Sequence, residues 1–135
     1  MKLSKKAEYA LRAMIAMARA DEGTNFSIQE IAHGEQIPLK FLEQILLTLK
    51  NGGLLRSKRG VGGGYQLLLP PNRIPLGTII NLIDGPFDAL NAREPSALTA
   101  FMGELKLLVD GWLTQTTLAH VIERERAQAN LSFEI

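Results

Sequence analysis

A change in hydrophobic period near the middle of the chain limits the available folds more than any other feature. Over residues 38–50, apolar side chains recur every three or four positions, as on one face of a helix: Phe41, Leu42, Ile45, Leu46 and Leu49. Pro38 stands at the start of this segment and Asn51-Gly52-Gly53 at its end, where proline and glycine are favoured. The period changes over two short segments, 54–59 and 65–69, which lie on both sides of a glycine-rich stretch. The pattern predicts a helix followed directly by a β-hairpin with a flexible tip.

Two further helices are predicted ahead of this one. Ser4 is a candidate N-cap for a helix over residues 5–20, and Ser27 with Glu30 has the capping-box spacing of a short second helix. Three helices within 50 residues, the last two joined by residues 34–37, are typical of a helix-turn-helix. Because the hairpin follows, the segment is predicted to be a winged helix.

The C-terminal half begins with a predicted short helix over 74–84 and a loop over 86–96. Ser96 is the candidate N-cap of a long helix whose apolar stripe steps by three and four residues: Leu98, Phe101, Leu105, Leu108 and Trp112. Three more apolar residues widen the stripe: Met102, Val109 and Leu113. One winged helix is too small to cover so wide a face, so we expect a partner helix to pack against it. Thr117 is predicted to cap a last short helix, and residues 127–135 are expected to be mobile.

Composition excludes several classes of protein. The chain has no cysteine and two histidines, which rules out disulfides and thiolate metal sites and disfavours a multi-histidine metal centre. No apolar run reaches the roughly 18 residues of a membrane span, and no signal-peptide pattern is present, so we expect no membrane contact and a cytoplasmic location. No motif orders serine, histidine and acidic residues into a catalytic site, so we do not expect an enzyme.

The formal net charge of +1 hides a division between the two halves. Residues 1–73 carry eleven Lys or Arg and six Asp or Glu, a balance of +5, whereas residues 74–135 carry four and eight, a balance of −4. Such an asymmetry indicates that the first half meets a polyanion. With a winged helix there, double-stranded DNA is the expected partner.

The predicted fold class is mainly α with a small β-hairpin wing: a winged helix-turn-helix plus a long C-terminal dimerisation helix. We divide the chain into a DNA-binding domain (1–73), a linker helix with a sensor-type loop (74–96), dimerisation helices (97–126) and a flexible tail (127–135).

The hairpin is the strongest local candidate for DNA contact. It carries three basic residues within four positions, no acid from Leu54 to Leu69, and several glycines, so we expect contacts from Arg56, Lys58, Arg59, Gly60, Gly62, Gly63, Gly64 and Tyr65. Arg59 directly precedes the tip, where a guanidinium can enter a narrow minor groove. The alternative is a solvated hairpin. A nucleotide-binding loop is disfavoured, because neither Lys-Ser nor Lys-Thr nor a helix start follows.

The helix that follows Pro38 is the predicted reading helix. Its first turn would point to the major groove, and its expected contacts are Pro38, Leu39, Lys40, Phe41, Glu43 and Gln44. Glutamine can pair with adenine and glutamate can accept from the cytosine amino group, although Glu43 as a solvated surface acid is the alternative. Contacts nearer the N-terminus are predicted for Lys2, Ser4, Lys5, Tyr9 and Ser27.

The sequence resembles the Rrf2 family of bacterial transcriptional regulators. The resemblance is carried by MKLSKKAEYALRAM, IPLKFLEQILLTLKNGGLLRSKRGVGGGYQL and LGTIINLIDGP, and it extends more weakly to TTLAHVI. It implies a homodimer on an imperfect palindrome, with Glu43 and Gln44 in the reading helix and Arg59 in the wing. It also implies a regulator of a small set of genes, with repression more frequent than activation.

The resemblance breaks down at the sensor. Many members bind an iron–sulfur cluster through three cysteines in the loop before the long helix, and here that loop has none. Glu8 and His33 match the types of two further family ligands, but without sulfur they do not make a cluster site, so we expect no cofactor and no metal. Either this member senses differently, through a small-molecule or protein effector, or Ala92 and Ser96 replace cysteines in an engineered chain.

Two other functions remain open on sequence grounds. The winged helix can be a protein-interaction module with incidental DNA binding, or a small-molecule enzyme with a polar pocket. The operator, the effector and the sign of regulation are not encoded in any readable pattern.

Overall fold

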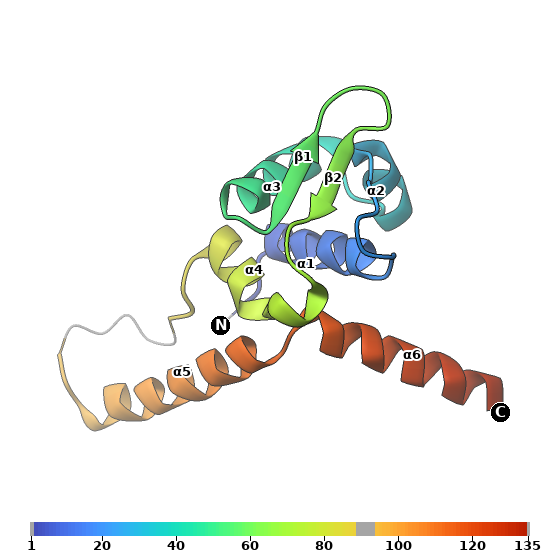
Figure 1. Ribbon diagram of the computed structural model, residues 1–135. Helices are drawn as coiled ribbons and strands as arrows, with labels where there is room; N and C mark the ends of the chain where they lie inside the picture. The colour runs from blue at the N-terminus through green and yellow to red at the C-terminus, as the bar shows by residue number, and fades with distance from the viewer. Residues whose placement is uncertain (1, 89–93, 135) are drawn as a thin grey trace.

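The computed structural model describes residues 2–88 and 94–134, with side chains through residue 131. Its elements follow in the order α1 (Lys5–Ala18), α2 (Ile28–Glu35), α3 (Leu39–Asn51), β1 (Leu55–Lys58), β2 (Gly64–Leu67), a 3-10 turn η1 (Pro71–Arg73), α4 (Leu76–Asp84), α5 (Ala97–Gln115) and α6 (Leu118–Glu134). The predicted fold class is confirmed: a helix-turn-helix, a hairpin wing and long C-terminal helices. Figure 1 shows α1 to α4 and the hairpin gathered in one body, from which α5 and α6 extend in different directions.

The core forms around α1, because small side chains let neighbouring helices approach it closely. Ala7, Ala10 and Ala13 are fully buried, and the buried face of α3 packs toward the same interior. Two more elements close this core, through Ile79 of α4 and Leu118 of α6, both fully buried. The winged helix and the start of α6 thus share one hydrophobic interior.

The serine caps predicted from sequence are confirmed. The hydroxyl oxygens of Ser4, Ser27 and Ser96 accept hydrogen bonds from the backbone N–H groups at the third helical positions of α1, α2 and α5. The reciprocal side-chain bond of a full capping box is present only at Ser96 among these, where Thr99 accepts from the Ser96 N–H.

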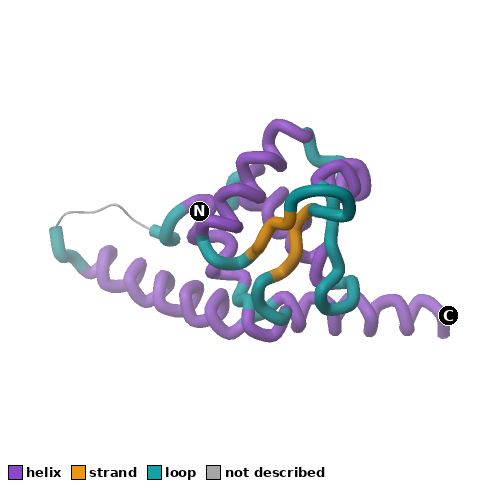
Figure 2. Tube along the Cα trace, turned by 45° about the horizontal axis from the view of Figure 1, so that its top comes forward, coloured by secondary structure: helices purple, strands orange, loops and turns teal. Residues whose placement is uncertain are grey.

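The hairpin is antiparallel and pairs Leu55 with Leu67 and Lys58 with Gly64. An isolated antiparallel bridge joins it to the α1–α2 loop, because the N–H groups of Phe26 and Tyr65 each donate to the other's carbonyl, at 2.9 and 2.8 Å. The wing is therefore held along one edge by the preceding loop, and Figure 2 shows the two strands beside the helical body.

The break predicted near residues 114–117 is an elbow held by backbone hydrogen bonds. The Leu76 N–H donates to the Thr116 carbonyl at 2.8 Å, and the Leu118 N–H donates to the Ile74 carbonyl at 3.0 Å. At Thr117, the predicted cap of the last helix, the backbone N–H is the donor: it donates to Nδ1 of His120 at 2.9 Å, and Oγ1 of Thr117 lies 3.2 Å from the same nitrogen. The start of α4 thus sets the angle between α5 and α6.

The prediction of a short last helix is wrong. α6 continues to Glu134, because the segment after Ile122 is rich in glutamate, arginine and alanine, which favour helix even without core anchors.

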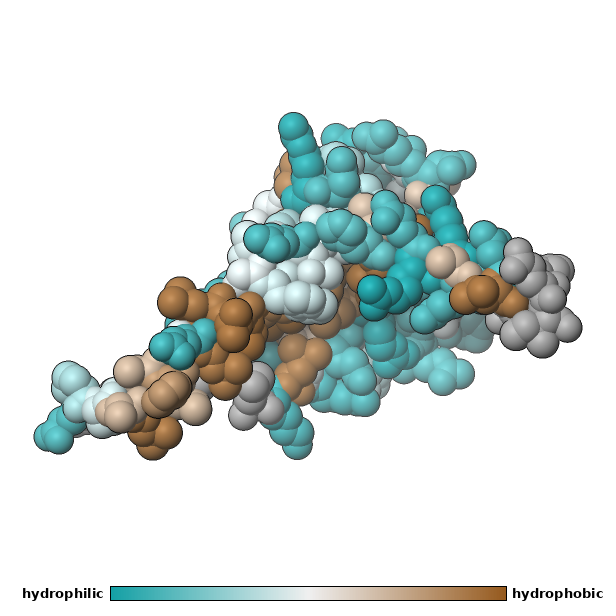
Figure 3. Space-filling view, turned by 90° about the horizontal axis from the view of Figure 1, so that it is seen from below, coloured by the Kyte–Doolittle hydropathy of each residue, from teal (hydrophilic) through white to brown (hydrophobic). Residues whose placement is uncertain are grey.

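Apolar side chains lie open along α5. Phe101 is 65% exposed, Trp112 is 59% exposed, and Leu98 and Leu108 are also exposed, whereas Leu105 is half-buried. Seen from below, hydrophobic surface, coloured brown in Figure 3, gathers along the extended arm. The other side of α5 is covered by α4 of the same chain. The two helices are so close there that a Cβ on Gly77 of α4 would lie 3.0 Å from Cβ of Leu113 on α5.

Candidate nucleic-acid interface

The predicted reading helix, α3, buries four of the five apolar residues of its predicted stripe, whereas the fifth, Phe41, is 52% exposed. Leu42, Ile45, Leu46 and Leu49 are fully buried, and the opposite side is open to solvent. We call this open side the reading face; it consists of Lys40, Glu43, Gln44 and Leu47, with Pro38, Leu39 and Phe41 exposed at its start. Leu47 was missed by the sequence analysis, because a leucine within an apolar helix gives no local sign that it faces outward.

The N-terminus of α3 differs from those of its neighbours α1 and α2. No side chain caps it, since Pro38 occupies the N-cap position. Its first-turn N–H groups consequently have no side-chain acceptor, and such groups favour an anion supplied from outside, such as a phosphate. At the other end, the positive φ of 84° belongs to Gly53, while Gly52 has an ordinary φ of −82°.

The wing presents its basic residues to solvent next to α3. Arg56, Lys58 and Arg59 are all exposed. The first strand follows α3 directly, and the Leu54 N–H donates to the Leu49 carbonyl at 3.0 Å. The cationic strand and the reading helix are thereby fixed against each other.

The glycines of the tip have two different roles. Gly60 and Gly62 have positive φ values of 93° and 76° with open space around the missing Cβ. A Cβ on Gly63 would lie 2.2 Å from the Lys58 carbonyl, and one on Gly64 would lie 2.2 Å from the Phe26 carbonyl. Gly63 and Gly64 are therefore required by the fold of the wing itself.

A polar chain that sequence reasoning missed orients the wing. Asn25, in the α1–α2 loop, donates from Nδ2 to the Gly62 carbonyl at 2.8 Å and accepts from Nε2 of Gln66 at 2.5 Å. Oε1 of Gln66 accepts from Nε of Arg56 at 3.0 Å. No sequence pattern indicates this set of hydrogen bonds, because Asn25 and Gln66 lie 41 positions apart in the sequence.

Asn25→Ala is expected to weaken DNA binding by about fivefold or more, because it removes two hydrogen bonds, each contributing about 0.5–1.5 kcal/mol, that hold the wing. Fluorescence anisotropy on a labelled operator measures the effect. Asn72→Ala, which changes an exposed asparagine on η1, is the matched control. Equal affinities for the two variants would show that the wing needs no such support.

The first helix contributes an aromatic and cationic cluster close to α3. The ring of Tyr9 lies 6.4 Å from that of Phe41, with Nζ of Lys5 at 5.4 Å and the guanidinium of Arg12 at 5.6 Å from the Tyr9 centroid. Nζ of Lys5 also lies 2.7 Å from the Glu8 carboxylate; this hydrogen bond and charge raise the pKa of Lys5 and lower the pKa of Glu8. Lys2 is exposed just ahead of the helix.

The two serines among the predicted contacts are engaged within the chain. Beyond capping α1, Ser4 donates its N–H to Oδ2 of Asp84 at 3.1 Å and its hydroxyl to the same carboxylate. Ser27 accepts from the Glu30 N–H at 3.1 Å. Their hydroxyls stabilise helix starts and the joint between α1 and the end of α4.

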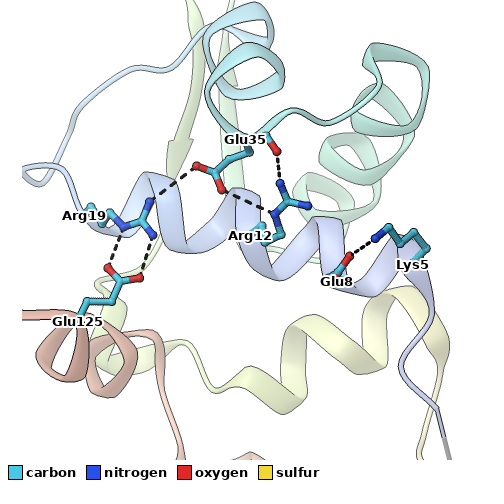
Figure 4. A network of polar contacts seen from close by, with 6 residues as sticks. All are labelled: Lys5, Glu8, Arg12, Arg19, Glu35 and Glu125. Atoms are coloured by element: carbon cyan, nitrogen blue, oxygen red, sulfur yellow. Dashed lines mark hydrogen bonds and ion pairs between the residues drawn. The ribbon is translucent and has the colours of Figure 1, made fainter. Parts of the chain in front are cut away.

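An ion-pair chain links α6 to the helix-turn-helix (Figure 4). Nε and Nη2 of Arg19 each donate to the Glu125 carboxylate at 2.8 Å, and Nη1 lies 3.7 Å from Glu35. Nε of Arg12 lies 3.8 Å from the same Glu35 carboxylate, and its Nη2 donates to the Glu35 carbonyl. Glu35 ends α2 directly before Gln36, whose φ of 53° makes the turn toward α3. These ion pairs thus fix the turn between α2 and α3 relative to α1 and α6.

The Arg19–Glu125 pair predicts a pH effect. The hydrogen bond from Arg19 lowers the pKa of Glu125. A depressed pKa in the folded state adds stability above the unfolded value of about 4.3, and this contribution is lost as the pH falls through the folded-state value. Because both side chains are partly exposed, the contribution is at most about 1 kcal/mol. Urea titrations between pH 3 and 7 are expected to show a shallower acid-side loss of stability for Glu125→Gln than for Glu123→Gln; identical curves would contradict this.

The described side chains do not fit an iron–sulfur cluster. The sequence supplies no thiolate, and within residues 2–88 and 94–131 no three side chains of His, Asp or Glu gather as metal ligands. Glu8 is paired with Lys5, and His33 is exposed near the end of α2. Of the two positions considered as former cysteines, Ser96 caps α5 and Ala92 lies outside the described residues. In the described part of the chain, no helix is both long and apolar enough to cross a bilayer.

A helix-turn-helix whose reading helix lies against a basic hairpin defines the class of winged-helix transcriptional regulators. Comparison with known proteins specifies the family. Residues 3–124 match the Rrf2 family, described as iron-dependent transcriptional regulators. The chain belongs to the Rrf2 family; it is a DNA-binding transcriptional regulator and not an enzyme.

Individual relatives support the assignment. The HTH-type transcriptional regulator IscR of Cereibacter sphaeroides is 30% identical over 138 residues, covering 93% of this chain and 89% of that protein. The solved structure of CymR, the global cysteine regulator of B. subtilis, gives a TM-score of 0.83 at 30% identity and covers 92% of this chain and 98% of its own. The solved structure of IscR from T. potens gives a TM-score of 0.80 at 28% identity and covers 93% of this chain and 88% of that one.

Proposed function

We propose that two copies of this chain bind a palindromic operator in the cytoplasm and repress the adjacent genes. The observation that carries the proposal is the shared exposure of the reading face on α3 and of Arg56, Lys58 and Arg59 on the adjoining wing. Lys40, Glu43 and Gln44 would contact base edges in the major groove, while Arg59 would enter the neighbouring minor groove. Lys2, Lys5 and the first turn of α3 would bind phosphates.

The proposed dimer forms along α5. Its seam consists of Leu98, Phe101, Leu105, Leu108 and Trp112, and all but Leu105 are exposed in the single chain. Beside Trp112, an open cavity of about 760 Å³ lies at the elbow, with Leu76 and Val121 among its lining residues. A second copy packed along the seam would cover both the stripe and this cavity, and burying apolar surface of this kind drives association.

The test is to sequence the genomic fragments that the protein retains at physiological salt. We expect enrichment of one motif with two-fold symmetry. Retention of fragments without a common motif would contradict the proposal and favour the protein-interaction alternative.

Salt dependence tests the phosphate contacts separately. Each neutralised phosphate contributes a slope of about −0.9 to log K against log salt concentration, so several contacts in each half-site predict a steep loss of affinity. Operator titrations from about 50 to 200 mM salt measure the slope. A flat response would exclude phosphate as a principal ligand.

A further inference from the structure

The reading face contains apolar side chains as well as hydrogen-bonding ones. Leu39 is 42% exposed and Leu47 is 52% exposed, although α3 otherwise buries its leucines. Residues four apart in a helix lie in one row, so Leu39, Glu43 and Leu47 form a row with the carboxylate between two leucines. Lys40 and Gln44 form the adjacent row on the same side.

This row has a counterpart in the major groove. Its residues are spaced by about 6 Å along the helix axis, close to two base-pair steps of about 3.4 Å. A glutamate there accepts from the cytosine amino group, whereas an aliphatic side chain has one distinctive target, the C5 methyl group of thymine. Neither leucine belongs to the buried core, so the fold itself gives no reason for large apolar side chains at these positions.

We propose that Leu39 and Leu47 are specificity-determining residues that contact thymine methyl groups on either side of the base pair read by Glu43. The inference rests on the proposed function, since it needs α3 in the major groove. It adds a preference for thymine that the hydrogen-bonding residues alone do not supply, because a uracil at the same position offers them the same acceptor.

The experiment replaces thymines of the selected operator by deoxyuridine, one position at a time, which removes only the methyl group. Burial of one methyl-sized group corresponds to about a fourfold change in affinity. We expect two positions in each half-site, one on either side of the base pair read by Glu43, where the wild-type protein loses about fourfold in affinity. Leu39→Ala is expected to bind the thymine and uracil operators equally at one of these positions, and Leu47→Ala at the other.

Leu68→Ala is the matched control, because Leu68 is 47% exposed and lies outside α3. This variant should keep the full uracil effect. Circular dichroism checks that all three variants remain folded, as expected for exposed positions.

Three outcomes overturn the inference. A uracil operator that binds the wild type as tightly as the thymine operator would overturn it alone, leaving the proposed function intact. The inference also fails, again without the proposed function, if both α3 variants keep the wild-type uracil penalty. Failure to select any operator would overturn the proposed function and this inference together.

Discussion

Phe101→Asp is expected to make the protein monomeric and to lower its affinity for a complete operator by about 100-fold or more. A charge within the proposed α5 seam cannot be buried against a second copy without a large desolvation cost. Two linked reading heads bind a palindrome about 10²–10⁴ times more tightly than one, and that advantage is lost with the dimer. Sedimentation equilibrium and operator titration measure the two effects on the same sample.

Leu107→Asp is the matched control for this substitution. Leu107 is 73% exposed, on the same helix, but it lies outside the seam. It should leave both the dimer and operator binding intact. If Leu107→Asp separates the copies while Phe101→Asp does not, the seam has been assigned to the wrong side of α5. The affinity of Phe101→Asp for a single half-site should equal that of the wild type, which would show that the reading head still folds.

Arg59→Ala is expected to weaken operator binding by about ten- to a hundredfold and to relax the preference at A·T-rich positions. Arg59 is exposed where β1 meets the tip, and Gly60 at φ 93° follows it. A guanidinium favours the narrow minor groove of A·T tracts because the negative potential is enhanced there, and well-placed arginine contacts contribute about 1–3 kcal/mol. Titrations on the selected operator and on a variant with G·C pairs at the wing positions measure affinity and preference.

Two further variants separate shape from charge. Arg126→Ala removes the same charge from an exposed position on α6 and should change affinity little. Arg59→Lys keeps the charge without the planar guanidinium, so it should restore part of the affinity but not the A·T preference. An Arg59→Ala protein with unchanged affinity and sequence preference would remove the wing from the proposed interface.

The features predicted correctly from sequence depend on neighbours in the chain. The caps at Ser4, Ser27 and Ser96 each involve a backbone N–H three residues away. The wing follows from the change of period after Gly53, and the buried side of α3 follows from spacing alone. The same local reasoning failed at α6, where an absence of apolar anchors was weighed above the helix propensity of glutamate, arginine and alanine.

The features that were missed join residues far apart in the chain. Asn25 reaches the wing tip at Gly62, and Ser4 meets Asp84 across 80 positions. Gly64 was predicted only as a DNA contact, and its role in the fold was missed: its missing side chain makes room for the Phe26 carbonyl. Each depends on the relative placement of separate elements, for which a single sequence carries no periodic signal.

The order of residues by itself determined the helices, the hairpin, the lack of thiolate ligands and the basic character of the first half, because these depend on spacing, capping and composition. Only the tertiary structure decided that Leu39 and Leu47 share a solvent-facing row with Glu43, that Asn25 orients the wing, and that α6 is tied to the helix-turn-helix through Arg19. Those arrangements arise when several elements pack on one core, since packing determines which side of each helix remains open to a partner.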